Sequence, residues 1–384
     1  MDHFDIAVIG FGIRGLGLIT ANPELRGHRV LIVDSGRRFG AGAFVRILSE
    51  SNSNGSDFFN WVDGDGPYGP ILDLASVRDL RSRADCFDLQ LLAQALADAA
   101  EFVRATAPSH WSIARDAVAA VDLPTDGGTT LRFAHGRTVR ADRAVLACGV
   151  RERRASAYEA VLSSTLLAVP DEARAEELFP GARRFTIVGT AHSAFSALAK
   201  LSALGVEAEA VTMTGRSPVR LHYPSYDAYR RDGHPVAEAV PDPTEDVCPR
   251  TGQVFRYHGL RNRSRALFGD VSQGRLPVRL VIDPSGESTR REIEAADVVI
   301  QATGYVSDLP GIERTGRRVV TAPVALCDGD GVLLDADGRR VEDVYLMGCD
   351  PYPYKSRFTD PTVQYIDRGS AVLAALEAGR HANT

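Results

Sequence analysis

Short apolar runs that stop at a glycine or an acid recur along this chain and predict the ends of buried parallel strands. The first run covers residues 6–9 and stops at Gly10, and a helix-like segment follows it. A second run, residues 30–33, stops at Asp34. Strands that are buried on both faces read as continuous apolar segments rather than as alternating ones. The opening of the chain therefore predicts a strand, a helix and a second parallel strand.

The turn between the first strand and the helix reads GFGIRG, residues 10–15. Gly10 permits a tight turn, Gly12 lets the backbone approach a pyrophosphate, and Gly15 lets the helix pack closely on the strand. The helix N-terminus offers free N–H groups to phosphates. Asp34, 24 positions after Gly10, is placed to accept hydrogen bonds from a ribose diol. This spacing predicts a dinucleotide site.

A weaker copy of the same pattern lies near the middle of the chain. An apolar run at 185–188 leads into GTAHSA, residues 189–194. A helix-like run at 195–204 and another apolar run at 208–213 follow. Alanine replaces the second and third glycines, which the fingerprint tolerates at the third position and which loosens the phosphate approach at the second. Gly189 and Ser193 are the phosphate-binding candidates of this second site.

The second site ends differently from the first. Arg216 and Ser217 stand where the first site has Asp34. A guanidinium pairs with a 2′-phosphate, whereas an acid would repel it. We therefore expect an unphosphorylated ribose in the first site and NADPH in the second. The alternative for Arg216 is a solvated surface arginine.

Three more apolar runs, at 144–147, 298–302 and 344–347, end in glycine-containing tripeptides. Two nucleotide folds that are each closed by such a strand imply nesting, in which the second fold interrupts the first. We also expect a hairpin around residues 127–128 and one helical stretch at 78–104.

The expected domains follow from this nesting. Residues 1–165 form the first part of one dinucleotide-binding domain, and residues 180–305 form an NADPH-binding domain with an insertion at 218–275. Residues 306–384 complete the first domain.

Composition excludes several other classes of protein. The 384 residues carry a formal net charge of −6, whereas a nucleic-acid-binding protein would normally be basic. No apolar run approaches the roughly 18 residues of a membrane span, and the first residues lack a secretory signal. The five cysteines contain no CxxC pair, which argues against a redox disulfide or a zinc site and predicts no metal. We expect a cytoplasmic protein without nucleic-acid or membrane partners.

This order of motifs resembles the two-dinucleotide-binding flavoprotein superfamily, which includes glutathione-reductase-like enzymes and class B flavin monooxygenases. The resemblance implies an α/β fold with two nested Rossmann-like, three-layer ββα domains, and it covers nearly the whole chain. It implies that Gly10, Gly12, Gly15 and Asp34 bind FAD. The Gly348-Cys349-Asp350 segment is similar to the motif that holds the ribityl chain, although Cys349 is inserted.

The same resemblance assigns two further parts of the chain. The helix expected after residue 361 would direct N–H groups near Thr362 and Val363 toward the flavin pyrimidine. Residues 302–305, ATGY, are similar to a signature of N-hydroxylating monooxygenases, which places Gly304 and Tyr305 near the NADPH site. The chain departs from those families in reading GFGIRG where they have Pro-Ala or Pro-Ser, and it lacks an FxGxxxHxxxW motif.

Catalytic candidates are fewer than cofactor candidates. Asn52 and Asn54 lie in a polar loop, residues 49–61, that passes under the flavin in this fold, and the alternative is an ordinary turn. His192 starts the second helix, where it could face the cofactors or cap the helix. Tyr305 follows the last strand of the NADPH fold.

The insertion at 218–275 also carries candidates. In the N-hydroxylases the corresponding insertion helps to build the active site and the NADPH cleft. The alternative for each candidate is a packed tyrosine or a solvated arginine. The candidate residues are Tyr223, Tyr226, Arg256, Tyr257 and Arg261.

We therefore expect an FAD-dependent, NADPH-using oxidoreductase. The resemblance implies a monooxygenase that hydroxylates an amine or a similar small-molecule nucleophile, with a C4a-peroxyflavin as the oxygen donor and molecular oxygen as co-substrate. Two alternatives stay open. One is a flavin dehydrogenase or reductase that does not insert oxygen, and the other is a non-catalytic FAD- and NADP-binding protein.

Overall fold

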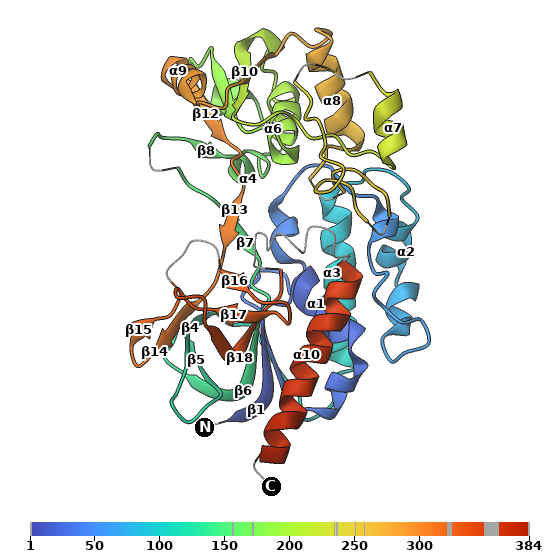
Figure 1. Cartoon of the computed structure of the whole chain (residues 1–384), viewed down its shortest axis with the longest axis vertical. Helices are drawn as coiled ribbons and strands as arrows, with labels where there is room; N and C mark the ends of the chain where they lie inside the picture. The colour runs from blue at the N-terminus through green and yellow to red at the C-terminus, as the bar shows by residue number, and fades with distance from the viewer. Residues whose placement is uncertain are drawn as a thin grey trace.

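The computed structural model describes residues 2–155, 157–170, 173–233, 235, 237–249, 251–256, 258–320, 325–348 and 361–382, with only the backbone described at 361–363 and 379–382. These residues form two lobes, each built on its own sheet, and the chain visits the larger lobe first and last (Figure 1). In this part of the chain, no helix has both the length and the apolar character that crossing a bilayer requires.

The larger sheet has eleven strands in a branched arrangement. Its spine runs β15-β14-β4-β5-β6-β1-β2-β3, and β18 joins β6 while pairing with β17, which pairs with β16. The strands are β1 (His3–Ile9), β2 (Val30–Val33), β3 (Ser112–Ala114), β4 (Val118–Asp122), β5 (Thr129–Phe133), β6 (Thr138–Leu146), β14 (Gly311–Arg314), β15 (Arg317–Arg318), β16 (Leu326–Cys327), β17 (Val332–Leu334) and β18 (Arg340–Leu346).

Strand β6 belongs to two layers at once. One part of β6 pairs with the antiparallel β5, and its C-terminal part lies between the parallel strands β1 and β18. Helices α1 (Ile13–Ala21), α3 (Leu89–Ala105) and α10 (Pro361–Ala382) lie beside the parallel strands. Helices, parallel strands and antiparallel strands thus form three layers, as expected for the first nucleotide fold.

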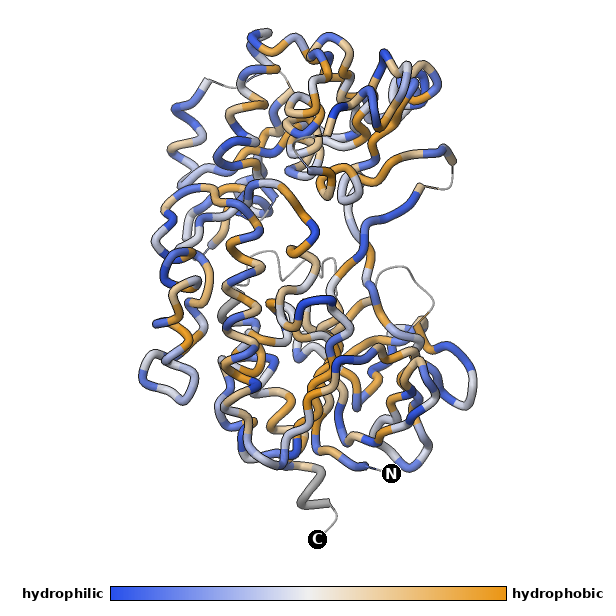
Figure 2. Tube along the Cα trace, turned by 180° about the vertical axis from the view of Figure 1, so that it is seen from behind, coloured by the Kyte–Doolittle hydropathy of each residue, from blue (hydrophilic) through white to orange (hydrophobic). Residues whose placement is uncertain are grey.

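Alternate residues of β1 explain why its run at 6–9 is continuously apolar. Ile6 and Val8 are fully buried in the core between the sheet and the helices. Ala7 and Ile9 are buried in a second core that includes Val121 of β4. Figure 2 shows the same central strands as mostly hydrophobic, with polar residues toward the periphery. Both faces of the strand are covered, so neither face needs polar residues.

The smaller sheet has five parallel strands in the order β11-β10-β9-β12-β8. Helices α6 and α8 contact each other, whereas α9 contacts β9 and β10. The elements are β8 (Val161–Leu162), β9 (Phe185–Val188), β10 (Val211–Gly215), β11 (Arg279–Ile282), β12 (Val298–Gln301), α4 (Ser163–Leu166), α5 (Ala175–Leu178), α6 (His192–Ala203), α7 (Tyr226–Arg231), α8 (Asn262–Ser272) and α9 (Glu287–Ala295).

A short antiparallel pair connects the lobes. Strand β7 (Val150–Glu152) leaves the larger lobe, and β13 (Tyr305–Ser307) returns to it. The remaining elements are α2 (Ala75–Arg81) and the 3₁₀ turns η1 (Pro23–Gly27), η2 (Gly42–Arg46), η3 (Gly55–Asp57), η4 (Gly69–Asp73) and η5 (Ala208–Ala210).

Two local expectations differ from the structure. The apolar run at 208–213 begins with the 3₁₀ turn η5, and its strand starts at Val211. The helical stretch at 78–104 divides into α2 and α3, because the Asp88 carboxylate accepts the Gln90 N–H and caps a new helix. The hairpin around residues 127–128 is confirmed as the connection between β4 and β5.

Candidate functional site

The first nucleotide turn leaves no room for side chains at two of its three glycines. Gly10 has φ +93°, and a Cβ there would overlap the carbonyl oxygen of Ala147. A Cβ on Gly15 would overlap the carbonyl oxygen of Gly10. At Gly12 the nearest atom to an added Cβ is Cα of Gly42, at 3.5 Å. Gly12 is thus not required by the fold, and its open face is the one that a close-lying phosphate would need.

Asp34 ends β2 beside this turn and is 7% exposed. Its carboxylate accepts the Gly36 N–H at 3.2 Å and the Gly40 N–H at 3.1 Å. These bonds shape the loop after β2 and leave further lone pairs, since an ionised carboxylate accepts about four hydrogen bonds. Asp34 can therefore hold the loop and a ribose hydroxyl together.

The second nucleotide turn is as tight as the first at its opening glycine, but it holds alanine at the positions of Gly12 and Gly15. Gly189 has φ +141°, and a Cβ there would overlap the carbonyl oxygen of Ala302. Ala191 is the N-cap of α6, and Ala194 is fully buried without a glycine. Ser193 Oγ lies 3.3 Å from the Tyr305 hydroxyl. Gly304, the candidate that follows β12, has φ +91°, and no atom lies within 4 Å of an added Cβ.

Arg216 and Ser217 follow β10 and are both exposed. The Thr190 hydroxyl donates to the carbonyl oxygen of Ser217 at 3.2 Å, which ties this segment to the turn after β9. An added Cβ on Gly286 would lie 4.0 Å from Cδ of Arg216. Arg216 is thus an exposed residue next to the segment that the Thr190 hydroxyl binds.

The polar loop at 49–61 meets the insertion of the smaller lobe. The Asn52 amide donates to the carbonyl oxygen of Gly259 at 3.2 Å and accepts the Arg261 N–H at 2.9 Å. Asn54 is the N-cap of η3, and its N–H donates to Asp57 Oδ2 at 3.2 Å. Asn52 therefore links the two lobes, which the sequence did not indicate, and Asn54 caps a turn.

The insertion candidates are mostly engaged in packing. The Tyr223 hydroxyl donates to Glu238 at 2.6 Å, and burial raises the pKa of Tyr223 well above its usual range. Arg265 lies 4.3 Å over the Tyr223 ring. Tyr226 packs at 5.7 Å from the Tyr229 ring. These contacts favour a structural role for the two tyrosines.

Two insertion arginines contact their own loop, and one candidate cannot be placed. Arg261 donates to the carbonyl oxygen of Arg256. Arg256 lies 3.9 Å from Cys248 Sγ. Tyr257 lies outside the described residues.

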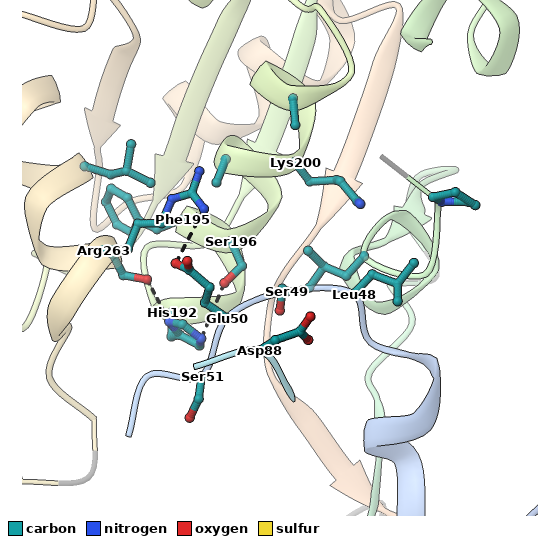
Figure 3. Close-up of a pocket in the computed structure, with 16 residues that line it drawn as sticks. Leu48, Ser49, Glu50, Ser51, Asp88, His192, Phe195, Ser196, Lys200 and Arg263 are labelled. Atoms are coloured by element: carbon teal, nitrogen blue, oxygen red, sulfur yellow. Dashed lines mark hydrogen bonds and ion pairs between the residues drawn. The ribbon is translucent and has the colours of Figure 1, made fainter. Parts of the chain in front are cut away.

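A pocket of about 510 Å³ opens between the lobes beside His192 (Figure 3). Its walls include the loop at 48–51, one side of α6 and the start of α8. Glu50 and Arg263 form an ion pair at 3.4 Å across it. Its volume falls within the range of small-molecule sites. Glu50, Asp88, Lys200 and Arg263 line this pocket, and no sequence motif marked them.

His192 stands at one end of this pocket. Its Nδ1 lies 2.7 Å from Ser264 Oγ on α8, and its Nε2 lies 3.4 Å from Ser196 Oγ. Burial lowers the pKa of His192 to about 4, while a hydrogen bond to the Glu50 backbone opposes that shift. His192 is therefore neutral near pH 7 and joins α6 to α8.

The end of the expected flavin site is described only in part. Gly348 has φ +70°, and α10 begins at Pro361 as expected. Cys349 and Asp350 lie outside the described residues, as do the side chains of Thr362 and Val363. The described turns fit two dinucleotides, because each places a helix N-terminus and a glycine-lined turn at the carboxyl end of a parallel strand.

Comparison with solved structures identifies this architecture. The ornithine N-hydroxylase of Kutzneria sp. 744, with reduced FAD, NADP⁺ and L-ornithine, superposes with a TM-score of 0.60 at 15% identity over 98% of this chain and 100% of that chain. The cadaverine monooxygenase of Erwinia amylovora, bound to FAD, gives a TM-score of 0.61 at 16% identity over 98% and 95% of the two chains. The fold is that of the two-dinucleotide-binding flavoproteins. The predicted fold class is confirmed.

Comparison with curated proteins finds a similar sequence. The CMP-5′-(3-aminopropyl)phosphonate hydroxylase of Streptomyces rubellomurinus is 28% identical, and the match covers 98% of each protein. No protein-family model matches the chain. This flavoprotein fold is thus accompanied by full-length similarity to a hydroxylase.

Proposed function

We propose that this protein is an FAD- and NADPH-dependent monooxygenase that hydroxylates an amine or a similar small-molecule nucleophile with molecular oxygen. The observation that carries the proposal is the pair of nucleotide turns on one nested fold, together with full-length similarity to a hydroxylase. Bound FAD would accept hydride from NADPH and supply the oxygen chemistry. The protein's own residues would bind and orient the cofactors and exclude water.

The two turns receive different cofactors in this proposal. Residues 1–165 and 306–384 hold FAD, with Gly12 under the pyrophosphate and Asp34 on the ribose. Residues 180–305 hold NADPH, with the α6 N-terminus at the pyrophosphate and Arg216 at the 2′-phosphate. The sign of the charge supports this division, because Asp34 would repel a 2′-phosphate and the guanidinium attracts one.

The proposed substrate class is a primary alkyl amine. Ornithine, cadaverine and the 3-aminopropyl group, named for the three relatives above, share an amine at the end of a short carbon chain.

We also propose that the enzyme works in the cytoplasm, where thiols stay reduced. The five cysteines are far apart in the sequence and form no CxxC pair, which fits that compartment.

The test measures NADPH oxidation, oxygen uptake and product mass together. FAD-loaded enzyme is mixed with NADPH and, in turn, with cadaverine, ornithine, 3-aminopropylphosphonate and its CMP conjugate. A product one oxygen atom heavier than its substrate, formed with matching consumption of oxygen and NADPH, is the expected result. The matched control replaces each amine with its deaminated analogue.

Other outcomes select the alternatives. NADPH oxidation that depends on an added electron acceptor, with no oxygenated product, would indicate a flavin reductase. A protein that binds both cofactors but oxidises no NADPH would indicate a non-catalytic binding role.

A further inference from the structure

The second residue of α1, Arg14, lies inside the first nucleotide turn, where its side chain reaches α10. Arg14 Nη1 donates to Gln364 Oε1 at 3.1 Å, and the guanidinium lies 5.8 Å over the Tyr365 ring. The side chain also passes close to Gly348, where an added Cβ would lie 2.5 Å from Arg14 Nε. Arg14 therefore touches the first nucleotide turn, the closing turn at Gly348 and the first turns of α10.

This position is electrostatically unfavourable for a cation. Arg14 belongs to the first turn of α1 and contacts the fourth residue of α10, so two helix N-termini lie close to its charge. Helix N-termini disfavour cations and favour anions. Within the part of the chain that the structure describes, no carboxylate forms an ion pair with Arg14, and its partners are a neutral amide and an aromatic ring. A bound anion would offset this concentration of positive charge.

We propose that the Arg14 guanidinium positions FAD by pairing with its pyrophosphate. This inference rests on the proposed FAD binding. The pyrophosphate is the anion expected at the N-terminus of α1, where the Gly12 face is open. A guanidinium presents paired donors that match phosphate oxygens. Gly348 leaves space for the arginine side chain, which gives that glycine a role besides its positive φ.

The second nucleotide turn provides an internal comparison. The residue equivalent to Arg14 is Ser193, whose hydroxyl lies 3.3 Å from the Tyr305 hydroxyl and carries no charge. Arg216, which we expect to supply the cation of the second site, lies instead at the end of β10. Of the two turns, the first thus has a cationic side chain within its six residues, and the second has a neutral serine at the same position.

The test uses Arg14→Met, Arg14→Lys and the control Arg29→Met in the full-length protein. Methionine keeps an unbranched stem beside Gly348 while removing the charge. Arg29 is exposed and lies 5.7 Å over the Phe4 ring, at the opposite end of the same strand–helix–strand unit. Flavin-free protein is titrated with FAD by fluorescence, and the midpoint potential of the bound flavin is measured.

We expect Arg14→Met to raise the dissociation constant for FAD roughly tenfold to a hundredfold, as loss of a charge-assisted hydrogen bond does. Arg14→Lys should give a dissociation constant between those of wild type and Arg14→Met, since lysine cannot bind phosphate bidentately. Arg29→Met should bind FAD as tightly as wild type does. The midpoint potential should move by less than about 30 mV, the shift that a tenfold difference between the affinities for oxidised and reduced FAD would give, because both forms carry the same pyrophosphate. The melting temperature of the flavin-free variant should stay close to wild type.

Three results would overturn the inference. An unchanged dissociation constant would show that Arg14 only packs against α10. A larger shift in potential would show that its charge acts on the flavin ring. A wild-type chain that takes up no FAD would overturn the proposed function as well.

Discussion

The two nucleotide turns follow the same backbone route but tolerate different side chains. In the first turn a Cβ at Gly15 would overlap the Gly10 carbonyl oxygen, whereas the second turn holds Ala194 fully buried at the equivalent place. The strand–helix–strand unit around the first turn is followed by the buried Asp34, whose carboxylate accepts two loop N–H groups. The unit around the second turn is followed by the exposed Arg216.

We propose that this difference separates a resident cofactor from an exchanging one. A tightly packed turn with a buried acid suits a cofactor that stays bound through many turnovers. A turn that tolerates side chains and is followed by an exposed cation suits a cofactor that enters and leaves in each cycle. Each of the following variants tests that contrast.

The largest effect should come from Gly12→Val. The nearest neighbour of an added Cβ is 3.5 Å away, so the flavin-free protein should fold. The side chain would occupy the space that the pyrophosphate needs, so the purified variant should be colourless. Flavin absorbance checks that the variant lacks flavin, and circular dichroism checks that it folds.

Gly15→Val is the matched comparison. Its side chain would overlap the Gly10 carbonyl oxygen, so this variant should lose stability as well as flavin. A yellow Gly12→Val protein would show that no pyrophosphate lies against Gly12.

Arg216→Ala should have the next largest effect. Loss of a charge-assisted hydrogen bond costs about 1.5–3 kcal/mol, so the KM for NADPH should rise roughly tenfold to a hundredfold. The KM for NADH should hardly change, because NADH lacks the 2′-phosphate. Arg290→Ala on α9, also an exposed arginine, is the control. Equal losses with both cofactors would indicate that Arg216 supports the fold instead.

His192→Gln should have the smallest effect, and it should appear only in acid. The pKa of His192 is about 4 in the folded protein against an ordinary 6.5. The unfolded chain therefore binds a proton first as the pH falls below about 6.5, and folded stability is lost down to about pH 4. Between pH 7 and pH 5 this histidine should cost wild type roughly 1–2 kcal/mol, which the glutamine variant avoids.

Urea unfolding at pH 7 and pH 5 measures that difference. His135→Gln is the control, because the His135 side chain is 58% exposed and lies beside Asp116. The same loss of stability in wild type and in His192→Gln would contradict a half-buried, neutral histidine at the second turn.

Much of the fold could be predicted because its strongest patterns are local. The runs at 30–33 and 185–188 are β2 and β9 at the same limits, since each strand is buried along its whole length. The run at 208–213 misled because an apolar segment does not distinguish a 3₁₀ turn from a strand. The break between α2 and α3 falls at residues 82–88, and the aspartate that caps α3 is its only signal among otherwise ordinary residues.

The candidate site also has a part that the sequence could predict and a part that it could not. The glycines and the charges at Asp34 and Arg216 follow from the fingerprint, because backbone shape and ligand charge restrict the residue at each position. The pocket beside His192 combines the loop at 48–51 with α6 and α8, which lie far apart in the chain. No local sequence pattern predicts that these distant segments form one pocket.

By itself, the sequence determined where the nucleotide turns lie, which strands are buried and that the second fold interrupts the first. These features depend on glycine geometry and on the burial of neighbouring residues. Only the tertiary structure decided that Asn52 binds the 259–261 segment, that Glu50 pairs with Arg263, and that Arg14 reaches Gln364. Each of these contacts joins residues more than 200 positions apart, and their partners are chosen by how the two lobes and α10 pack.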